Sequence, residues 1–225
     1  MSFAQAIQSA TPRPNFNVEW ALGNFLRFDI PLIEKQDRQI LYTDTDVIFC
    51  CDPRISDIGG VIGACSEYIV DESGVAESTA AFNAGVMVLD VHALRGIHHL
   101  LVEYTIADDC ARGAQGWYDQ GVLNQVFRGR WTVLPQSLNW RPYAGCALQP
   151  EIIHFQRFKP HQMLSMRSGG SESPVVASGE LHHAAKAEFA RALAAFEAQF
   201  PPPARHVWNQ FARERGAGNR SFHSW

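Results

Sequence analysis

Two carboxylates inside an apolar run are the side chains of this sequence best suited to chemistry. Asp44 and Asp46 lie within residues 40–49, whose other members are mostly apolar. An apolar run of this length predicts a strand buried on both faces. Side chains i and i+2 of a strand point to the same side, so we expect the two carboxylates to converge at its carboxyl end.

A buried pair of carboxylates needs a compensating partner, because an ionised carboxylate is costly to bury unless it is paired or bound to a cation. Two hard oxygen donors suit Mg²⁺ or Mn²⁺, which commonly bind one or two carboxylates together with substrate phosphates. Asp44 and Asp46 therefore predict a metal site. The alternative is a strand that ends in a turn, with both acids solvated.

A second polar group interrupts the apolar residues 82–90, which we predict to form a strand. Asn83 is suited to present its amide to a ligand hydroxyl, and Gly85 permits close approach of a ligand or of another backbone segment. The alternative is a β-bulge in which the amide of Asn83 is satisfied by the protein itself.

Three further side chains stand at the ends of predicted elements. His154 ends a short apolar strand at 152–155, Lys159 follows five residues later, and Asp119 begins a short helix around 117–127. A neutral imidazole is a good metal ligand, and a nearby lysine is suited to bind a phosphate. The alternatives are a structural histidine and a helix cap.

The remaining elements follow from hydrophobic periodicity and from turn residues. We predict an amphipathic helix from 17 to about 31, a strand at 61–65, a loop at 71–80, a helix at 91–111, a strand at 131–135, and helices at 180–200 and 207–215. Residues 1–16 are expected to be a flexible leader and residues 165–180, rich in Ser and Gly, a linker.

Composition limits the possible partners. The 225 residues are 46% hydrophobic with a net charge of −4, which allows one buried core and gives no electrostatic reason to expect nucleic acid as a partner. No apolar run reaches the roughly 20 residues of a transmembrane helix. Five cysteines without paired metal-type spacing predict reduced thiols and a cytoplasmic protein.

Five motifs in a fixed order resemble family-8 glycosyltransferases, the glycogenin-like and galactinol-synthase-like enzymes, over residues 25–160. The motifs are Leu41-Tyr42-Thr43-Asp44-Thr45-Asp46, Phe82-Asn83-Ala84-Gly85-Val86-Met87, Asp119-Gln120-Gly121-Val122-Leu123-Asn124, Leu134-Pro135 with Asn139-Trp140, and Ile153-His154-Phe155 with Lys159-Pro160. The resemblance implies an α/β protein of the GT-A type (nucleotide-diphospho-sugar transferase), with a mixed, mostly parallel sheet flanked by helices.

The resemblance also assigns roles by matching position. It implies that Asp44, Asp46 and His154 hold Mn²⁺ or Mg²⁺ against a nucleotide-sugar diphosphate, and that Lys159 contacts its phosphates. The same matching places Asn83, with Gly85 beside it, near the sugars, and it places Asp119 and Gln120 beside the reacting anomeric carbon. The expected reaction moves a sugar, with retention of configuration, from a UDP-sugar to an acceptor hydroxyl.

Three departures from the family pattern qualify this prediction. Gly121 replaces a carboxylate, and Arg157 and His161 replace a glycine and a tryptophan near the phosphate-binding lysine. Family members usually carry a nucleotide-binding β-α-β region before the helix that starts here near Asn17. We expect a catalytic domain at 17–164 that lacks these first elements, through truncation or loss, followed by a helical extension at 181–225. Loss of central strands would expose apolar edges, which favours truncation.

Two other functions stay open from the sequence. A degenerate transferase would bind a sugar or a partner without turnover, as Gly121 and the absent first strands would suggest. A haloacid-dehalogenase-type phosphatase would use Asp44 as nucleophile and Asp46 as acid-base, with Asp108 and Asp109 as later metal ligands. That class also needs a lysine or an arginine between these motifs, and Arg95 is the candidate.

Overall fold

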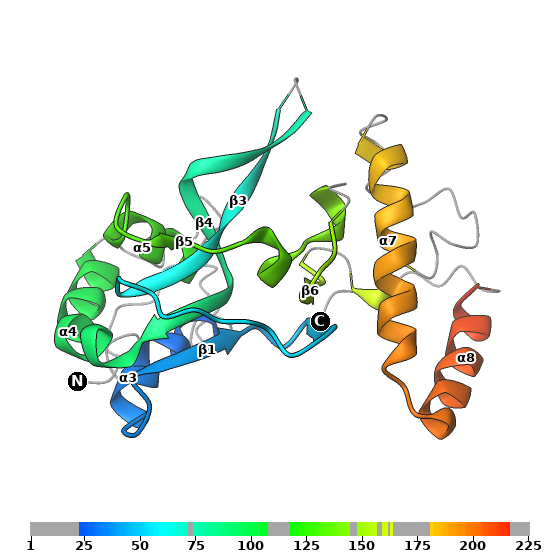
Figure 1. Cartoon of the computed structure of the whole chain (residues 1–225), viewed down its shortest axis with the longest axis horizontal. Coiled ribbons are helices and arrows are strands. Elements are labelled where there is room, and N and C mark those ends of the chain that lie inside the picture. The colour runs from blue at the N-terminus through cyan, green and yellow to red at the C-terminus, as the bar shows by residue number, and fades with distance from the viewer. Residues whose placement is uncertain are drawn as a thin grey trace, which may run out of the picture. The chain divides into compact units, whose positions relative to one another are not determined.

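The chain forms two compact units, and Figure 1 labels most of their helices and strands. The structure, a computed structural model, describes residues 23–71, 74–107, 118–144, 148–156, 159–161, 163 and 181–216. The first unit comprises the described parts of Met1–Thr43, Arg54–Glu67 and Glu77–Pro135, and the second those of Asp44–Pro53, Tyr68–Ala76 and Gln136–Trp225. The predicted leader 1–16 and linker 165–180 lie outside the described residues, and the predicted domain boundaries stay a prediction.

The main sheet has four strands in the order β1-β4-β3-β5. Their bounds are β1 Gln39–Thr43, β3 Ile62–Asp71, β4 Gly74–Asp90 and β5 Thr132–Val133. β1 pairs antiparallel with β4, and β3 pairs parallel with β5. The predicted mixed sheet with flanking helices is confirmed, with more antiparallel pairing among the described strands than expected.

The predicted single strand over residues 40–49 is wrong. Two strands occupy this stretch, β1 and then β2 (Val47–Phe49), and Asp44–Asp46 form the turn between them. The physical reason is that β1 pairs with β4, whereas β2 pairs with β6 (Ile152–His154). β1 is also only half-buried, since it lies at one end of the described sheet.

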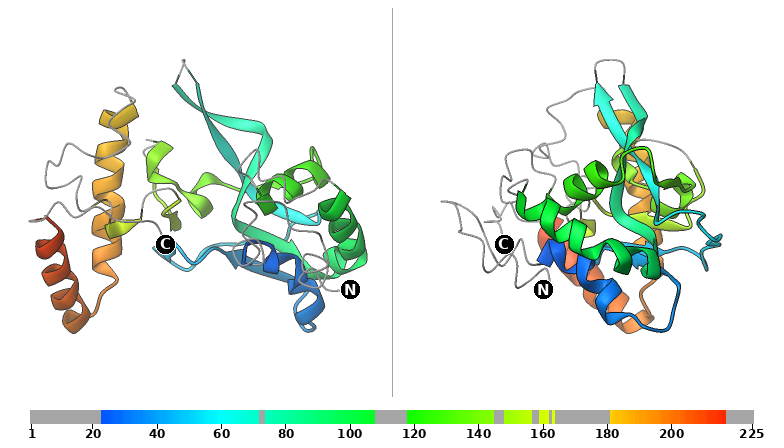
Figure 2. Two further views of the ribbon diagram at one scale, coloured as in Figure 1. Left: turned by 180° about the vertical axis from the view of Figure 1, so that it is seen from behind. Right: turned by 90° about the vertical axis from the view of Figure 1, so that its left-hand side faces the viewer.

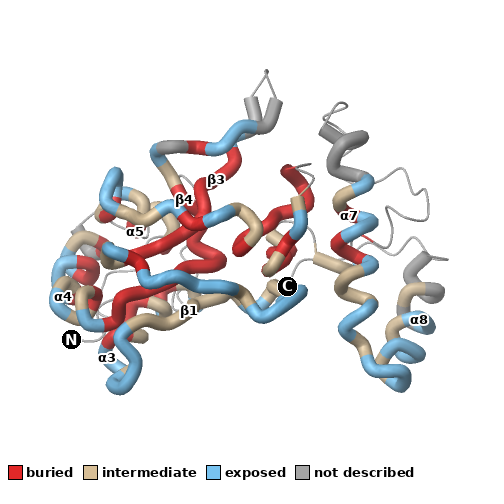
Figure 3. The backbone as a smooth tube through the Cα atoms, viewed as in Figure 1, coloured by how far each residue is buried: buried red, intermediate tan, exposed pale blue. Residues whose placement is uncertain are grey.

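Helices complete the first unit around one apolar core. Asp90 ends β4 and its carboxylate accepts a hydrogen bond of 2.9 Å from the N–H of Ala93, which caps α4 (Val91–Ala107). The two views of Figure 2 show α4 beside α5 (Tyr118–Val126). Figure 3 shows how the buried residues gather along the middle of β3 and β4. The core contains Phe25, Phe28, Ile62, Ala64, Phe82, Ala84, Met87, Leu89, Leu94, Leu101, Val102, Val122, Leu123 and Phe127.

The second unit is built around the short antiparallel pair β2–β6. Val47 lies opposite His154, and Trp140 forms a parallel bridge to Ile153 on β6. The 3₁₀ turns η3 (Gln136–Asn139) and η4 (Pro142–Ala144) precede β6, and the helices α7 (Leu181–Ala198) and α8 (Pro202–Gly216) follow it. The buried core of this unit contains Tyr68, Trp140, Tyr143, Ala144, Ile153, Phe155, Met163, Phe189, Ala192 and Leu193.

Other element predictions hold in part. The predicted loop at 71–80 is wrong, because β3 extends to Asp71 and β4 already begins at Gly74. The predicted helix at 17–31 is seen from residue 23 onward, as a helical turn followed by η1 (Leu26–Asp29) and α3 (Ile30–Ile33). None of the helices in the described part of the chain is long and apolar enough to cross a membrane.

Candidate active site

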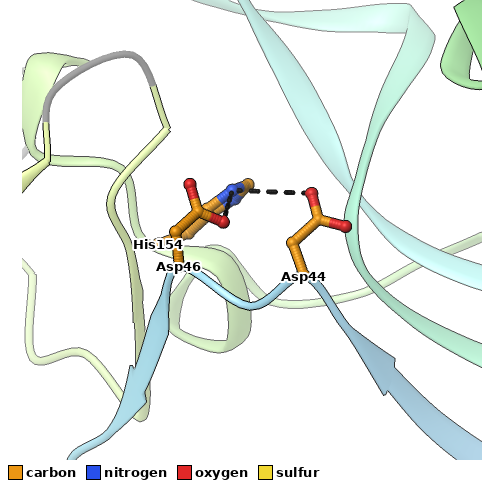
Figure 4. Close-up of side chains that lie close together, drawn as sticks. All are labelled: Asp44, Asp46 and His154. Atoms are coloured by element: carbon orange, nitrogen blue, oxygen red, sulfur yellow. Dashed lines mark ion pairs between the residues drawn. The ribbon is translucent and has the colours of Figure 1, made fainter. Parts of the chain in front are cut away.

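Two carboxylates and one imidazole converge in the second unit. Asp44 and Asp46 project from the turn before β2, and His154 ends β6, as Figure 4 shows. Nε2 of His154 lies 3.4 Å from Oδ1 of Asp46 and 3.9 Å from Oδ2 of Asp44. One ligand atom from each residue falls within 4.8 Å of the others.

Strand pairing fixes this arrangement. The register of β2 with β6 sets Val47 opposite His154, so Asp46, the residue before Val47, lies beside the imidazole. The N–H of Phe155 donates a 2.8 Å hydrogen bond to the carbonyl of Asp46 and extends the pairing through the turn. The carboxylates therefore meet the histidine because the turn is held by the same main-chain ladder.

A buried amide orients the imidazole. Nδ1 of His154 lies 2.9 Å from Oδ1 of Asn139, and the two residues are 2% and 0% exposed. A side-chain carbonyl oxygen can only accept, so Nδ1 carries the proton and Nε2 faces the carboxylates. In this orientation Nε2 can donate a hydrogen bond to Asp46 or, without a proton, bind a metal, while the other nitrogen is held by a hydrogen-bond acceptor.

Lys159 supplies a positive charge at the same site. Its ammonium donates hydrogen bonds to Oδ2 of Asp46 and, over 3.2 Å, to the carbonyl of Phe155. Burial raises the pKa of Asp46, but the facing imidazole of His154 and the ammonium of Lys159 lower it more strongly. The pKa of Asp46 thus lies well below its usual range, and this carboxylate is ionised at neutral pH.

The donor set fits a hard divalent cation. Ligands of Mg²⁺ or Mn²⁺ at about 2.1 Å from the ion stand about 3 to 4.2 Å apart, which brackets both distances from Nε2 of His154. Asp44 and Asp46 remain partly exposed, with side chains 29% and 21% accessible. The open side leaves coordination positions for water or phosphate oxygens.

A second polar cluster lies in the first unit. Asn83 and Gln120 donate hydrogen bonds of 3.0 and 3.1 Å to the same carboxylate oxygen of Glu67 on β3. The carbonyl oxygen of Gln120 accepts from the N–H of Ala84 at 2.9 Å and from the amide of Asn83 at 3.2 Å. The N–H of Gly85 donates to Asn83 at 3.1 Å. Three of the predicted site residues, Asn83, Gly85 and Gln120, thus lie together.

Asp119 completes this cluster through an arginine. Nε of Arg27 lies 3.0 Å from Oδ2 of Asp119, and both side chains are 8% exposed. Arg27 also donates a 2.8 Å hydrogen bond to the carbonyl of Ala84, and its guanidinium lies over the ring of Tyr42. The start of α5 is therefore tied to β4 next to Asn83 and Gln120.

Sequence reasoning missed Glu67, Arg27 and Asn139 as site residues. Glu67 is 4% exposed and follows the apolar residues 61–65, so an acid within an extended apolar strand was the available signal. Asn139 was noted only as part of a motif. The predicted site residues fall into two groups: Asp44, Asp46, His154 and Lys159 lie in the second unit, and Asn83, Gly85, Asp119 and Gln120 lie in the first.

Comparison with known proteins identifies the family through one family model. The family model described as glycosyl transferase family 8 matches residues 5–162. An active-site mutant of LgtC has 16% sequence identity and a TM-score of 0.54, covering 90% of this chain and 76% of that one, which shows the shared fold. No sequence among the curated proteins matches.

Two larger glycosyltransferases also align. The bifunctional glycosyltransferase WbbM has 16% identity and a TM-score of 0.44 over 66% of this chain, and GlyE from Streptococcus pneumoniae has 21% identity and a TM-score of 0.47 over 60%. This chain spans 33% of the first structure and 38% of the second.

Proposed function

Because the chain belongs to glycosyl transferase family 8, we propose that it transfers a sugar from a nucleotide-diphosphate sugar to an acceptor hydroxyl. The observation that carries this proposal is the convergence of Asp44, Asp46 and His154 within 4.8 Å. When bound there, Mn²⁺ or Mg²⁺ would supply positive charge for the diphosphate leaving group. We further propose a UDP-sugar as donor, retention of configuration and a cytoplasmic location.

The second unit supplies the binding groups for the diphosphate. Asp44, Asp46 and His154 would hold the cation, and the ammonium of Lys159 is long and flexible enough to contact a phosphate oxygen. Asn139 keeps the imidazole oriented through its 2.9 Å contact. The ammonium of Lys159 would stabilise charge that develops on the departing diphosphate, next to the residues that would hold the cation.

The first unit supplies groups suited to a sugar. Asn83, Gln120 and Glu67 present amide and carboxylate groups within one hydrogen-bonded network. Such a network can exchange its internal hydrogen bonds for those of sugar hydroxyls without leaving a buried polar atom unsatisfied. Asp119, held by Arg27, would stand beside the anomeric carbon, where positive charge develops as the diphosphate departs.

The degenerate transferase is the second candidate, and Gly121 favours it, because a carboxylate is common at that position in the family. The phosphatase alternative is set aside, since the chain belongs to the glycosyltransferase family. Its proposed later acids, Asp108 and Asp109, lie outside the described residues.

Nucleotide release from a panel of nucleotide sugars, measured with and without Mn²⁺, tests the proposal. We expect metal-dependent hydrolysis of one donor by the wild-type chain and its loss in Asp46→Ala. Asp52→Ala, which changes an exposed acid after β2, the strand that follows Asp46, should retain the activity. If Asp46→Ala retains metal-dependent turnover, the metal assignment is wrong. If the wild-type chain binds a donor without releasing nucleotide, the degenerate function is correct.

A further inference from the structure

Asp46 is shared between two side chains of the second unit, the imidazole of His154 and the ammonium of Lys159. Its Oδ1 faces Nε2 of His154 at 3.4 Å, and its Oδ2 accepts the hydrogen bond of Lys159. A cation entering between Asp44, Asp46 and His154 therefore meets a carboxylate that already has an ammonium partner. In the absence of substrate, the cation and the ammonium of Lys159 therefore compete for the carboxylate of Asp46.

The ammonium of Lys159 can exchange Asp46 for another hydrogen-bond partner. Its side chain is 42% exposed, twice the 21% of Asp46, so the ammonium can move toward solvent without leaving a buried cavity. Its main chain is fixed, since its carbonyl accepts a 3.2 Å hydrogen bond from the N–H of Met163. A rotatable four-carbon stem on an anchored backbone allows the charged end to move while the residue stays in place.

We infer that Lys159 couples binding of the divalent cation to binding of the diphosphate. Without a diphosphate, its ammonium neutralises Asp46 and weakens cation binding by occupation and by repulsion. With a diphosphate, the ammonium gains a phosphate oxygen as its partner and Asp46 becomes fully available to the cation. Coupling between two ligands is reciprocal, so the cation strengthens diphosphate binding by the same factor.

This inference rests on the proposed function for the identity of the two ligands, and it makes a prediction opposite to that for an ordinary binding residue. Removing a ligand or a structural residue weakens cation binding, whereas removing Lys159 should strengthen it when no nucleotide is present. A unit charge about 5 Å from a divalent ion in a water-like medium opposes binding by about tenfold. The effect should shrink as salt is added, because the site is partly exposed.

Mn²⁺ affinity, measured from the free-ion electron paramagnetic resonance signal, tests the inference with and without saturating UDP. Lys159→Met keeps the apolar stem and removes the charge, and we expect it to bind Mn²⁺ about tenfold more tightly without UDP. It should also show a smaller gain on adding UDP. Lys159→Arg keeps the charge and should bind Mn²⁺ like the wild type without UDP. Lys35→Met, at an exposed lysine of the first unit, is the matched control and should change neither affinity.

The outcomes separate the inference from the function on which it rests. If Lys159→Met binds Mn²⁺ no more tightly than the wild type without UDP, or keeps the full gain with UDP, the coupling role is wrong. If the wild-type chain binds no Mn²⁺ even with UDP, both the metal site and the coupling are wrong. If the coupling is observed but no donor sugar is ever transferred, the inference stands and the proposed transfer fails.

Discussion

Replacing Asn139 with leucine should weaken Mn²⁺ binding although this residue does not touch the ion site. The amide oxygen of Asn139 accepts the hydrogen bond of Nδ1 of His154 over 2.9 Å, and leucine of similar size has no acceptor. The imidazole then has two states. It either keeps the proton on Nδ1 without this partner, or it moves the proton to Nε2, the atom that faces Asp44 and Asp46.

Both states disfavour the metal, and burial sets the size of the effect. Asn139 is 0% and His154 2% exposed, so water cannot readily replace the lost acceptor. A buried donor without an acceptor costs about 1 to 3 kcal/mol. Loss of an outer-shell partner of a metal-binding histidine typically lowers metal affinity about 10- to 100-fold, and we expect Asn139→Leu to fall within this range.

The assay is titration with Mn²⁺ without nucleotide, with folding checked by circular dichroism. Asn139→Asp keeps an acceptor and should retain most of the affinity. Tyr143→Phe, which removes a 3.1 Å hydrogen bond to Gln156 in the same unit, is the control for a general loss of packing. In the His154→Ala background, Asn139→Leu should cause no further loss, because its effect passes through the imidazole. Wild-type affinity in folded Asn139→Leu would refute this reasoning.

Three further changes test the fold and the sugar side. Asp90→Ala should lower the free energy of unfolding by about 1 kcal/mol through loss of the cap on α4. Burial raises the pKa of Asp90, but hydrogen bonds from Ala93 and Arg38 lower it by more, so the pKa of Asp90 lies below its usual value. The difference in unfolding free energy between variant and wild type, measured with urea, should therefore be full above about pH 4 and disappear as the pH falls below it. Phe196→Ala should lower the free energy of unfolding by about 2 kcal/mol in the same assay, because this half-buried ring of α7 lies 4.9 to 5.7 Å from the rings of Phe155, Phe200 and Trp208, the last on α8. An unchanged midpoint would mean that these ring contacts do not stabilise the second unit. Gln120→Leu should lower kcat/KM for the donor at least about tenfold while Mn²⁺ affinity stays unchanged. A parallel loss of Mn²⁺ affinity would contradict the proposal that the sugar-binding and metal-binding residues act separately.

Local patterns predicted most elements but not their partners. The apolar residues 152–155 and 131–135 are typical of strands, and the predicted helix at 91–111 is α4, described to Ala107. A turn at Asp44 and Asp46 is the alternative that the sequence leaves open, but the sequence cannot choose it over a continuous strand, because the residues before and after the two acids are equally apolar. Only the pairing of β1 with β4 and of β2 with β6 divides the run, and such pairing joins residues far apart in the sequence.

The same limit explains which site residues were found. The sequence predicts Asp44, Asp46 and His154 as site residues because their types suit a cation and because the family motifs match them. Arg27 and Glu67 carry no local signal of what they contact. Arg27 lies far before Asp119 in the sequence, although the two side chains are 3.0 Å apart. A charge on an amphipathic helix is usually solvated, and only the fold shows that this one is buried.

Two pairs of residues act on the predicted metal site, the buried pair Asn139 and His154 and the partly exposed pair Lys159 and Asp46. The effects of the two pairs on cation binding should respond differently to salt. Asn139 and His154 are buried, so they act on the cation through geometry that added salt does not screen. Lys159 and Asp46 are partly exposed, so they act through charge, which is screened over about 8 Å at physiological ionic strength. The loss of Mn²⁺ affinity in Asn139→Leu should therefore persist at 0.5 M salt, a value chosen at roughly three times the physiological level, whereas the gain in Lys159→Met should fade. A common salt response of both variants would mean that a single electrostatic effect, rather than an oriented ligand and a separate counter-charge, controls cation binding.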